Sequence, residues 1–184
     1  MQSIAIVGLG YVGLPLSLQF ARSGARVIGL DIDPEKVEMC NKGQSYIKHI
    51  HSETISEMRK KSQFEASTDF GRLRETSAVI ICVPTPLNKN REPDISYILV
   101  TGKALASHLR KGTLVVLEST TYPGTTDGDL RQVLEAGSGW KAGIDFHLAF
   151  SPDLGTSGVF AFGRKGQVEV YAGFPAGAGL EYLP

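Results

Sequence analysis

The chain has 184 residues, of which 42% are hydrophobic and 21% charged, a composition typical of a folded globular protein. Its 19 lysines and arginines balance its 19 aspartates and glutamates, so the overall charge does not favour a nucleic acid or an anionic membrane as partner. We expect no membrane segment and no signal peptide, because apolar runs are short and the N-terminus lacks a basic leader. Two cysteines favour a reduced, cytoplasmic setting over a disulfide scaffold.

Strand and helix patterns alternate along the chain. Strands are predicted at 4–7, 25–30, 64–67, 78–83, 114–117 and 147–150. Helices are predicted at 11–23, 34–41, 51–62, 95–110 and 127–136, with Asp33, Ser52 and Asp94 as N-caps. Buried strands joined by crossover helices indicate an α/β, Rossmann-like, doubly wound fold, with a mainly parallel sheet and helices on both faces.

The turn between the first strand and the first helix contains three spaced glycines, Gly8, Gly10 and Gly13. Gly8 allows a tight turn, Gly10 lets a pyrophosphate approach the backbone, and Gly13 lets the helix pack close to the strand. The following helix N-terminus offers free N–H groups and a positive dipole end to phosphates. The pattern predicts dinucleotide binding, with a purely structural turn as the alternative.

Asp31 follows Gly10 by about 20 positions, at the end of the second predicted strand. A carboxylate there accepts hydrogen bonds from the adenosine ribose and repels a 2′-phosphate, so NAD is predicted rather than NADP. Asp33 is interpreted as a helix cap only. Lys36 either reaches the adenosine end of the cofactor or is an ordinary solvated lysine.

Ligands of open α/β sheets bind beyond the carboxyl ends of the strands, so the sequences that follow the predicted strands are informative. Three further strand ends have distinctive sequences. They are "ICVPTPL" at 81–87, "LESTTYPGTT" at 117–126 and "AFSP" at 149–152. With "GLGYVGLPLS" and residues 29–50, they resemble the NAD-binding half of the UDP-glucose/GDP-mannose dehydrogenase family, the nucleotide-sugar 6-dehydrogenases. The resemblance covers residues 3–152, and "SYIKHI" and "CVPTPL" are most similar to the UDP-N-acetylglucosamine 6-dehydrogenase branch.

The resemblance implies an oxidoreductase that oxidises a UDP-sugar C6 alcohol to a carboxylate, through an aldehyde held at a cysteine, and reduces two NAD. Thr120 would order a catalytic water. Loop-end hydrogen bonding is the alternative role for Thr85 and Ser119, and packing without chemistry is the alternative for Tyr11. The cofactor site implied by position comprises Gly8, Gly10, Tyr11, Val12, Gly13, Asp31, Lys36, Pro84, Thr85, Ser119 and Thr120.

The sequence departs from the family after Pro152. Asp153 stands where the family has a glutamate, and Leu154 stands where it has an arginine. Asp153 is the second catalytic candidate beside Thr120, and its side chain is one methylene shorter than a glutamate. The family's nucleophilic cysteine motif is missing, and neither Cys40 nor Cys82 is predicted to replace it. His49 and His51 lack further ligands at suitable spacing, so no metal site is predicted.

Residues 1–152 are predicted to form the NAD-binding domain, and 153–184 a glycine-rich tail, with the catalytic and UDP-sugar-binding domains absent. Apolar residues in the tail can form one or two strands; they are Phe160, Val168, Val170, Tyr171 and Phe174. The chain alone is predicted to be an inactive, truncated or frameshifted nucleotide-sugar dehydrogenase. The alternatives are a non-enzymatic NAD-binding module, or another dehydrogenase with a short C-terminal element. The predicted partners are NAD and, in the full-length family, a UDP-sugar; the oligomeric state is left open.

Overall fold

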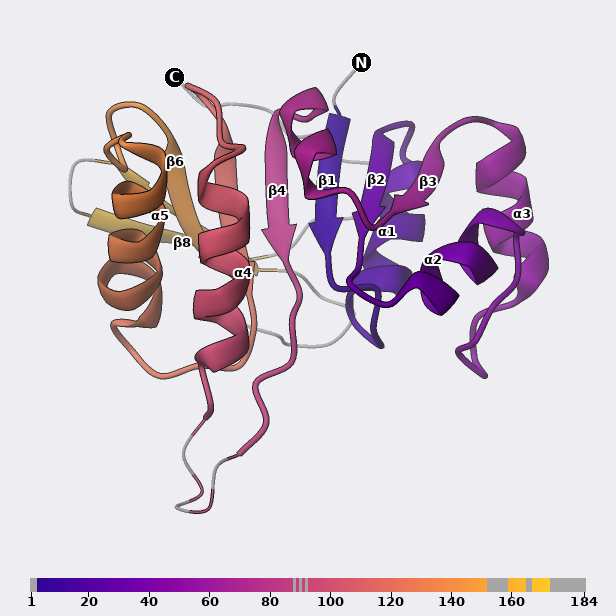
Figure 1. The fold of residues 1–184 in the computed structure, drawn as a ribbon, viewed down its shortest axis with the longest axis horizontal. Helices are drawn as coiled ribbons and strands as arrows, with labels where there is room; N and C mark the ends of the chain where they lie inside the picture. The colour runs from indigo at the N-terminus through magenta and orange to yellow at the C-terminus, as the bar shows by residue number, and fades with distance from the viewer. Residues whose placement is uncertain are drawn as a thin grey trace.

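A computed structural model of the chain describes residues 3–87, 89, 91, 93–151, 159–164 and 167–172, the last two segments by their backbone. Its strands are β1 (Ser3–Val7), β2 (Arg26–Leu30), β3 (Phe64–Ser67), β4 (Ala78–Ile81), β5 (Leu114–Glu118), β6 (His147–Ser151), β7 (Val159–Arg164) and β8 (Gln167–Ala172). They form one sheet in the order β3-β2-β1-β4-β5-β6-β7-β8 (Figure 1).

The helices are α1 (Gly13–Arg22), α2 (Pro34–Asn41), α3 (Ser52–Lys60), α4 (Ser96–Ala106) and α5 (Arg131–Ser138), with a 3-10 helix η1 (Phe70–Glu75) and a π-helix η2 (Thr125–Leu130). None of the helices in the described segments is long and apolar enough to cross a membrane. Strands β1 to β6 pair in parallel, whereas β7 and β8 are antiparallel additions at one edge. The predicted Rossmann-like, mainly parallel sheet is therefore confirmed.

Both faces of the sheet are buried, because successive side chains of a strand point to opposite sides. Ile6 of β1 belongs to an apolar cluster with Leu14 and Leu18 of α1. Its neighbour Val7 belongs to a second cluster, with Leu105 of α4. Helices therefore cover both faces of the sheet, as predicted (Figure 1).

Of the three predicted N-caps, Asp33 is confirmed, whereas Asp94 and Ser52 are not the N-caps of their helices. The Asp33 carboxylate accepts hydrogen bonds from the N–H groups of Glu35 and Lys36 at the start of α2. The N-cap of α4 is Ile95, and the Asp94 carboxylate, one residue earlier, accepts a hydrogen bond from the N–H of Ser96, the first residue of the helix. Ser52 is not the cap of α3, because its hydroxyl accepts from the Ser45 N–H at 3.0 Å and so serves the preceding loop.

Other element boundaries differ from the predictions. Helix α4 ends at Ala106 rather than near residue 110, and the helix predicted from residue 127 begins as the π-helix η2 at Thr125. The 3-10 helix η1 was not predicted at all. Two strands in the tail are confirmed as β7 and β8, while Phe174 and the domain boundary after residue 152 lie outside the described residues.

A network of four charged side chains joins β2, β3 and η1. Arg26 donates hydrogen bonds to Glu65 and Glu75 at 2.9 and 2.8 Å, and Arg72 donates to the same two carboxylates. The hydrogen bonds from Arg72, and then those from Arg26, lower the pKa of Glu75 to about 2. The negative charge of Glu75 is thus favoured in the folded chain.

Replacing Glu75 by Gln should lower the melting temperature at pH 7 by about 1–4 °C, because a partly exposed ion pair contributes about 1 kcal/mol or less. A carboxylate whose pKa is depressed on folding stabilises the fold above its unfolded pKa and loses this contribution as the pH falls through the folded pKa. The difference between wild type and variant should therefore shrink from pH 5 towards pH 2. Thermal melts across this range, with the exposed Glu53→Gln as control, test it. A difference independent of pH would contradict it.

Candidate functional site

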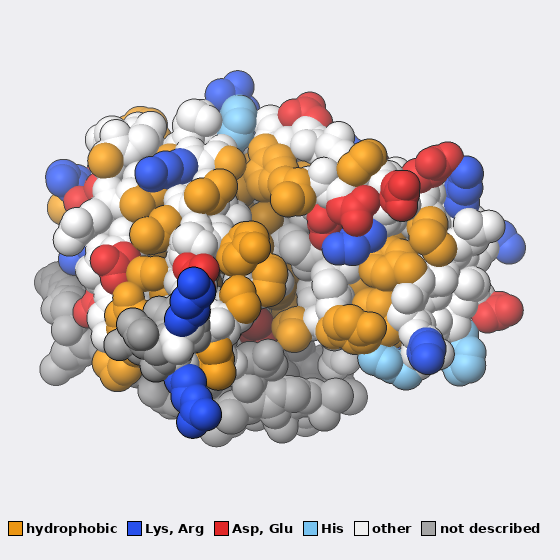
Figure 2. Space-filling view, turned by 60° about the horizontal axis from the view of Figure 1, so that its bottom comes forward, with side chains coloured by type: hydrophobic (Ala, Val, Ile, Leu, Met, Phe, Trp, Pro, Cys, Tyr) orange, Lys and Arg blue, Asp and Glu red, His pale blue; other side chains and the backbone are white. Residues whose placement is uncertain are grey.

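The candidate site lies at the carboxyl edge of the sheet, next to the point where the strand order reverses between β1 and β4. The turn after β1 leads to α1 on one face of the sheet, and the loop after β4 leads to α4, whose buried residues belong to the cluster on the other face. Figure 2 brings this edge forward and shows the surface hollowed between the two halves of the molecule, with hydrophobic side chains on its rims. A ligand crevice is expected at such a switch point.

Two glycines of the turn are required by the fold itself. Gly8 has a φ of +93°, and a Cβ there would lie 2.7 Å from the carbonyl oxygen of Cys82. A Cβ on Gly13 would lie 1.8 Å from the carbonyl oxygen of Gly8. The first residue after β4 approaches Gly8, and the turn itself approaches Gly13, at distances that exclude any side chain.

Gly10 differs from these two, because the chain itself does not require a glycine at this position. Its φ is not positive, and a Cβ would meet nothing within 4 Å. Within the described part of the chain, no hydrogen bond uses the N–H of Gly10, Tyr11 or Val12. These donors lie immediately before the first turn of α1, at its positive dipole end, and therefore fit a diphosphate.

Asp31, at the end of β2, is 7% exposed and accepts two backbone hydrogen bonds. Its Oδ2 accepts from the Leu9 N–H at 2.7 Å, and its Oδ1 accepts from the Asp33 N–H at 3.0 Å. Each carboxylate oxygen has a second lone pair, so ribose hydroxyls can still donate to it. The carboxylate thus lies beside the glycine-rich turn, residues 8–13, where the adenosine end of a dinucleotide is expected.

Three neighbours of these residues have contacts that limit their roles. Lys36 pairs with Asp33 across 3.9 Å, and its contact with a cofactor stays a prediction. Tyr11 is 77% exposed and stacks on His49, with 6.2 Å between ring centroids. Val12 is half-buried against the apolar cluster around α1.

Thr85 and Ser119 link the loops that follow β4 and β5. The Thr85 hydroxyl donates to the carbonyl oxygen of Thr120 at 3.0 Å, and the two hydroxyls of Thr85 and Ser119 lie 3.2 Å apart. Since Thr85 has one hydroxyl proton, Ser119 donates to Thr85. This is the alternative, loop-linking role, and contact of these residues with the cofactor stays a prediction.

The remaining candidates are partly accessible. Thr120 is exposed at the carboxyl end of β5, and Pro84 is exposed beyond β4. Asp153 lies outside the described residues.

Cys40 and Cys82 are both buried, and burial raises the pKa of Cys40 to about 11. Among the described residues, no cluster of His, Cys, Asp and Glu side chains is placed to hold a metal ion.

Ile32 was not predicted from the sequence as a site residue. It follows Asp31 and is 83% exposed, unlike the buried residues of β2 that precede it. The sequence signal for Ile32 is an apolar residue between two aspartates, just beyond a buried strand. Ile32 offers a surface on which a flat aromatic base can pack.

Residues 2–161 match the sequence profile of the UDP-glucose/GDP-mannose dehydrogenase family, NAD-binding domain. The UDP-N-acetyl-D-glucosamine 6-dehydrogenase of Pseudomonas aeruginosa is 32% identical over 150 residues, which cover 82% of this chain and 35% of the relative. The chain therefore spans about a third of the length of this relative.

Solved structures of similar proteins have the same fold. The NDP-N-acetyl-D-galactosaminuronic acid dehydrogenase of Methanosarcina mazei superposes with a TM-score of 0.77 at 37% identity, covering 83% of this chain and 34% of that one. The GDP-mannose dehydrogenase of Pseudomonas aeruginosa, solved as a ternary complex, gives 0.78 at 32% identity, covering 81% and 35%. NAD is the cofactor of the matched domain.

Replacing Gly10 by Ala should leave the melting temperature unchanged and raise the Kd for NAD by about tenfold or more, because the added methyl group occupies the space that a diphosphate needs. Gly128→Ala is the matched control, since a Cβ there also meets nothing within 4 Å. Calorimetric titration of both variants measures the effect. Equal NAD affinity of Gly10→Ala and wild type would contradict the proposed diphosphate position.

Proposed function

Because this chain belongs to the UDP-glucose/GDP-mannose dehydrogenase family, we propose that it is the cofactor-binding part of an enzyme that oxidises the C6 alcohol of a UDP-N-acetylhexosamine to a carboxylate. The oxidation transfers two hydrides, one to each of two NAD, and one water supplies the second carboxylate oxygen. The observation that carries the cofactor-binding part of the proposal is the pairing of an unhindered Gly10 with the buried Asp31 carboxylate beside the glycine-rich turn.

The proposed roles of the residues follow from their positions. The N–H groups of Gly10 to Gly13 bind the diphosphate, and the Asp31 carboxylate accepts hydrogen bonds from the adenosine ribose. Ile32 packs against the adenine ring. NAD, when bound, accepts the hydride, and the exposed Thr120 hydroxyl orients a water at the carboxyl end of β5.

The choice of a UDP-N-acetylhexosamine is supported by two findings. Residues 45–50, "SYIKHI", resemble the branch that oxidises these sugars. In addition, the relative from Pseudomonas aeruginosa has a UDP-N-acetylhexosamine, UDP-N-acetyl-D-glucosamine, in its name. The substrate is thus proposed from similarity to relatives, whereas NAD binding is also supported by the backbone geometry of this chain's glycine-rich turn.

For the 184-residue chain by itself we propose NAD binding without turnover. Oxidation of the aldehyde in this family is expected to need a reactive thiolate, and the sequence has two cysteines. Both are buried, and the raised pKa of Cys40 keeps its thiol protonated at neutral pH. These observations favour the second candidate function, an NAD-binding module without turnover, for the 184 residues by themselves.

The wild-type chain should bind NAD more tightly than NADP by about tenfold or more, because the Asp31 carboxylate repels a 2′-phosphate. Asp31→Ala should weaken NAD binding by about tenfold and bring the NAD to NADP ratio close to one. The ratio of the two dissociation constants is informative, because Asp31→Ala also removes the hydrogen bond from the Leu9 N–H, and this loss lowers the affinity for both cofactors alike. Calorimetric titrations measure it. A wild-type ratio of one would overturn the role of Asp31.

An assay of NADH formation with UDP-N-acetylglucosamine and UDP-glucose should show no sustained increase in absorbance at 340 nm. NAD binding by the same preparation, measured calorimetrically, ensures that the absence of turnover does not reflect unfolded protein. Sustained NADH formation would show that the thiol chemistry is not needed and would contradict the proposal for the chain alone.

A further inference from the structure

Tyr46 contacts the glycine-rich turn from a separate loop, residues 44–51, between α2 and α3. Its hydroxyl donates a hydrogen bond to the carbonyl oxygen of Leu9 at 2.5 Å. The N–H of Leu9 donates in turn to Asp31 Oδ2 at 2.7 Å. Both polar groups of this one residue are therefore held by side chains from distant parts of the sequence.

The hydrogen bond from Tyr46 fixes the plane of the Leu9–Gly10 peptide. A peptide unit is planar, and the described chain contains no cis peptide bond, so the carbonyl oxygen of Leu9 and the N–H of Gly10 point in opposite directions. With the carbonyl held towards Tyr46, the Gly10 N–H points away from that side chain. This N–H is one of the donors that no residue in the described part of the chain uses.

We propose that Tyr46 is a positioning residue of the cofactor site, whose hydroxyl orients the Leu9–Gly10 peptide so that the Gly10 N–H faces the diphosphate of the bound dinucleotide. This inference rests on the proposed function, because it assigns the residue that prepares the same site. It adds a contact that neither the glycine spacing nor Asp31 supplies.

The Tyr46 hydroxyl is restricted to the role of donor towards Leu9. A carbonyl oxygen can only accept, so the hydroxyl proton is directed to Leu9, and the buried Cys40 Sγ donates to the Tyr46 oxygen at 3.8 Å. Burial raises the pKa of Tyr46, so the hydroxyl stays protonated at neutral pH. The orientation of the peptide is therefore independent of pH in the physiological range.

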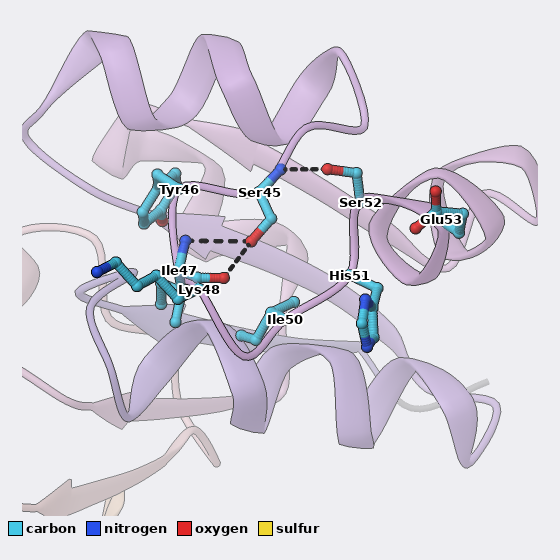
Figure 3. Close-up of a pocket in the computed structure, with 8 residues that line it drawn as sticks. All are labelled: Ser45, Tyr46, Ile47, Lys48, Ile50, His51, Ser52 and Glu53. Atoms are coloured by element: carbon cyan, nitrogen blue, oxygen red, sulfur yellow. Dashed lines mark hydrogen bonds between the residues drawn. The ribbon is translucent and has the colours of Figure 1, made fainter.

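The loop itself is braced on both sides of Tyr46 (Figure 3). The N–H of Ser45 donates a hydrogen bond to the Ser52 hydroxyl. The Ser45 hydroxyl donates to the carbonyl oxygen of Ile47 and accepts from the Ile47 N–H. The Ile47 side chain is 4% exposed and packs in the apolar cluster around α1. Hydrogen bonds and burial on both sides thus hold the Tyr46 backbone, and this fixes the direction in which its ring points.

Tyr46→Phe keeps the ring and removes only the hydroxyl. In NMR titrations of the full 184-residue chain, the variant should bind NAD and ADP-ribose about threefold to tenfold more weakly than wild type. Adenosine, which lacks the diphosphate, should bind both proteins equally. This difference separates an oriented peptide from a general loss of structure, which would weaken all three ligands.

Two control variants accompany it. Cys40→Ala perturbs the same buried region but leaves the bond from Tyr46 to Leu9 in place, and Tyr97→Phe removes a hydroxyl from the exposed face of α4. Both should keep wild-type affinity for NAD. Unchanged NAD affinity in Tyr46→Phe, or an equal loss for adenosine, would overturn the inference.

The amide signal of Gly10 tests the inference without any ligand. It should shift or broaden in Tyr46→Phe and stay in place in both control variants. If wild type binds neither NAD nor ADP-ribose, the proposed function fails, and an unchanged Gly10 signal in Tyr46→Phe would separately overturn the positioning role.

Discussion

The hydrogen bond from the Leu9 N–H to the Asp31 carboxylate joins the glycine-rich turn to the end of β2, and the candidate cofactor site depends on it. Glycines let the turn form without side chains, but they also leave its backbone the most conformational freedom. Asp31 removes part of that freedom and keeps its remaining lone pairs near the expected ribose. One buried carboxylate thus shapes the turn and prepares the place where the adenosine end of NAD is proposed to bind.

The three glycines of the turn have different physical origins, although their spacing makes them look alike in the sequence. Gly8 and Gly13 are required because Cys82, just after β4, and the turn itself leave no room for a Cβ. Gly10 has space around it and a φ that other residues adopt. The chain itself thus gives no reason for a glycine at this position, and the proposed diphosphate of NAD supplies one.

Much of the fold could be predicted from the sequence, because its signals are local. The apolar run of β4 indicated a strand buried on both faces, and the Asp33-Pro34 pair marked the start of α2 through a cap and a fixed φ. Ser52 was misassigned, since a serine hydroxyl near a helix start can equally serve a preceding loop. The Thr85–Ser119 and Tyr46–Leu9 contacts join residues more than 30 positions apart, and no local pattern encodes such pairs.

We propose that this chain binds NAD across the carboxyl edge of the sheet, between the glycine-rich turn and Asp31. A crystal structure of the 184-residue chain with NAD tests it most directly. We expect the pyrophosphate to lie within hydrogen-bond distance of the N–H groups of residues 10–13, and a ribose hydroxyl to donate to Asp31. A dinucleotide bound elsewhere, or one whose adenosine ribose makes no contact with Asp31, would contradict it.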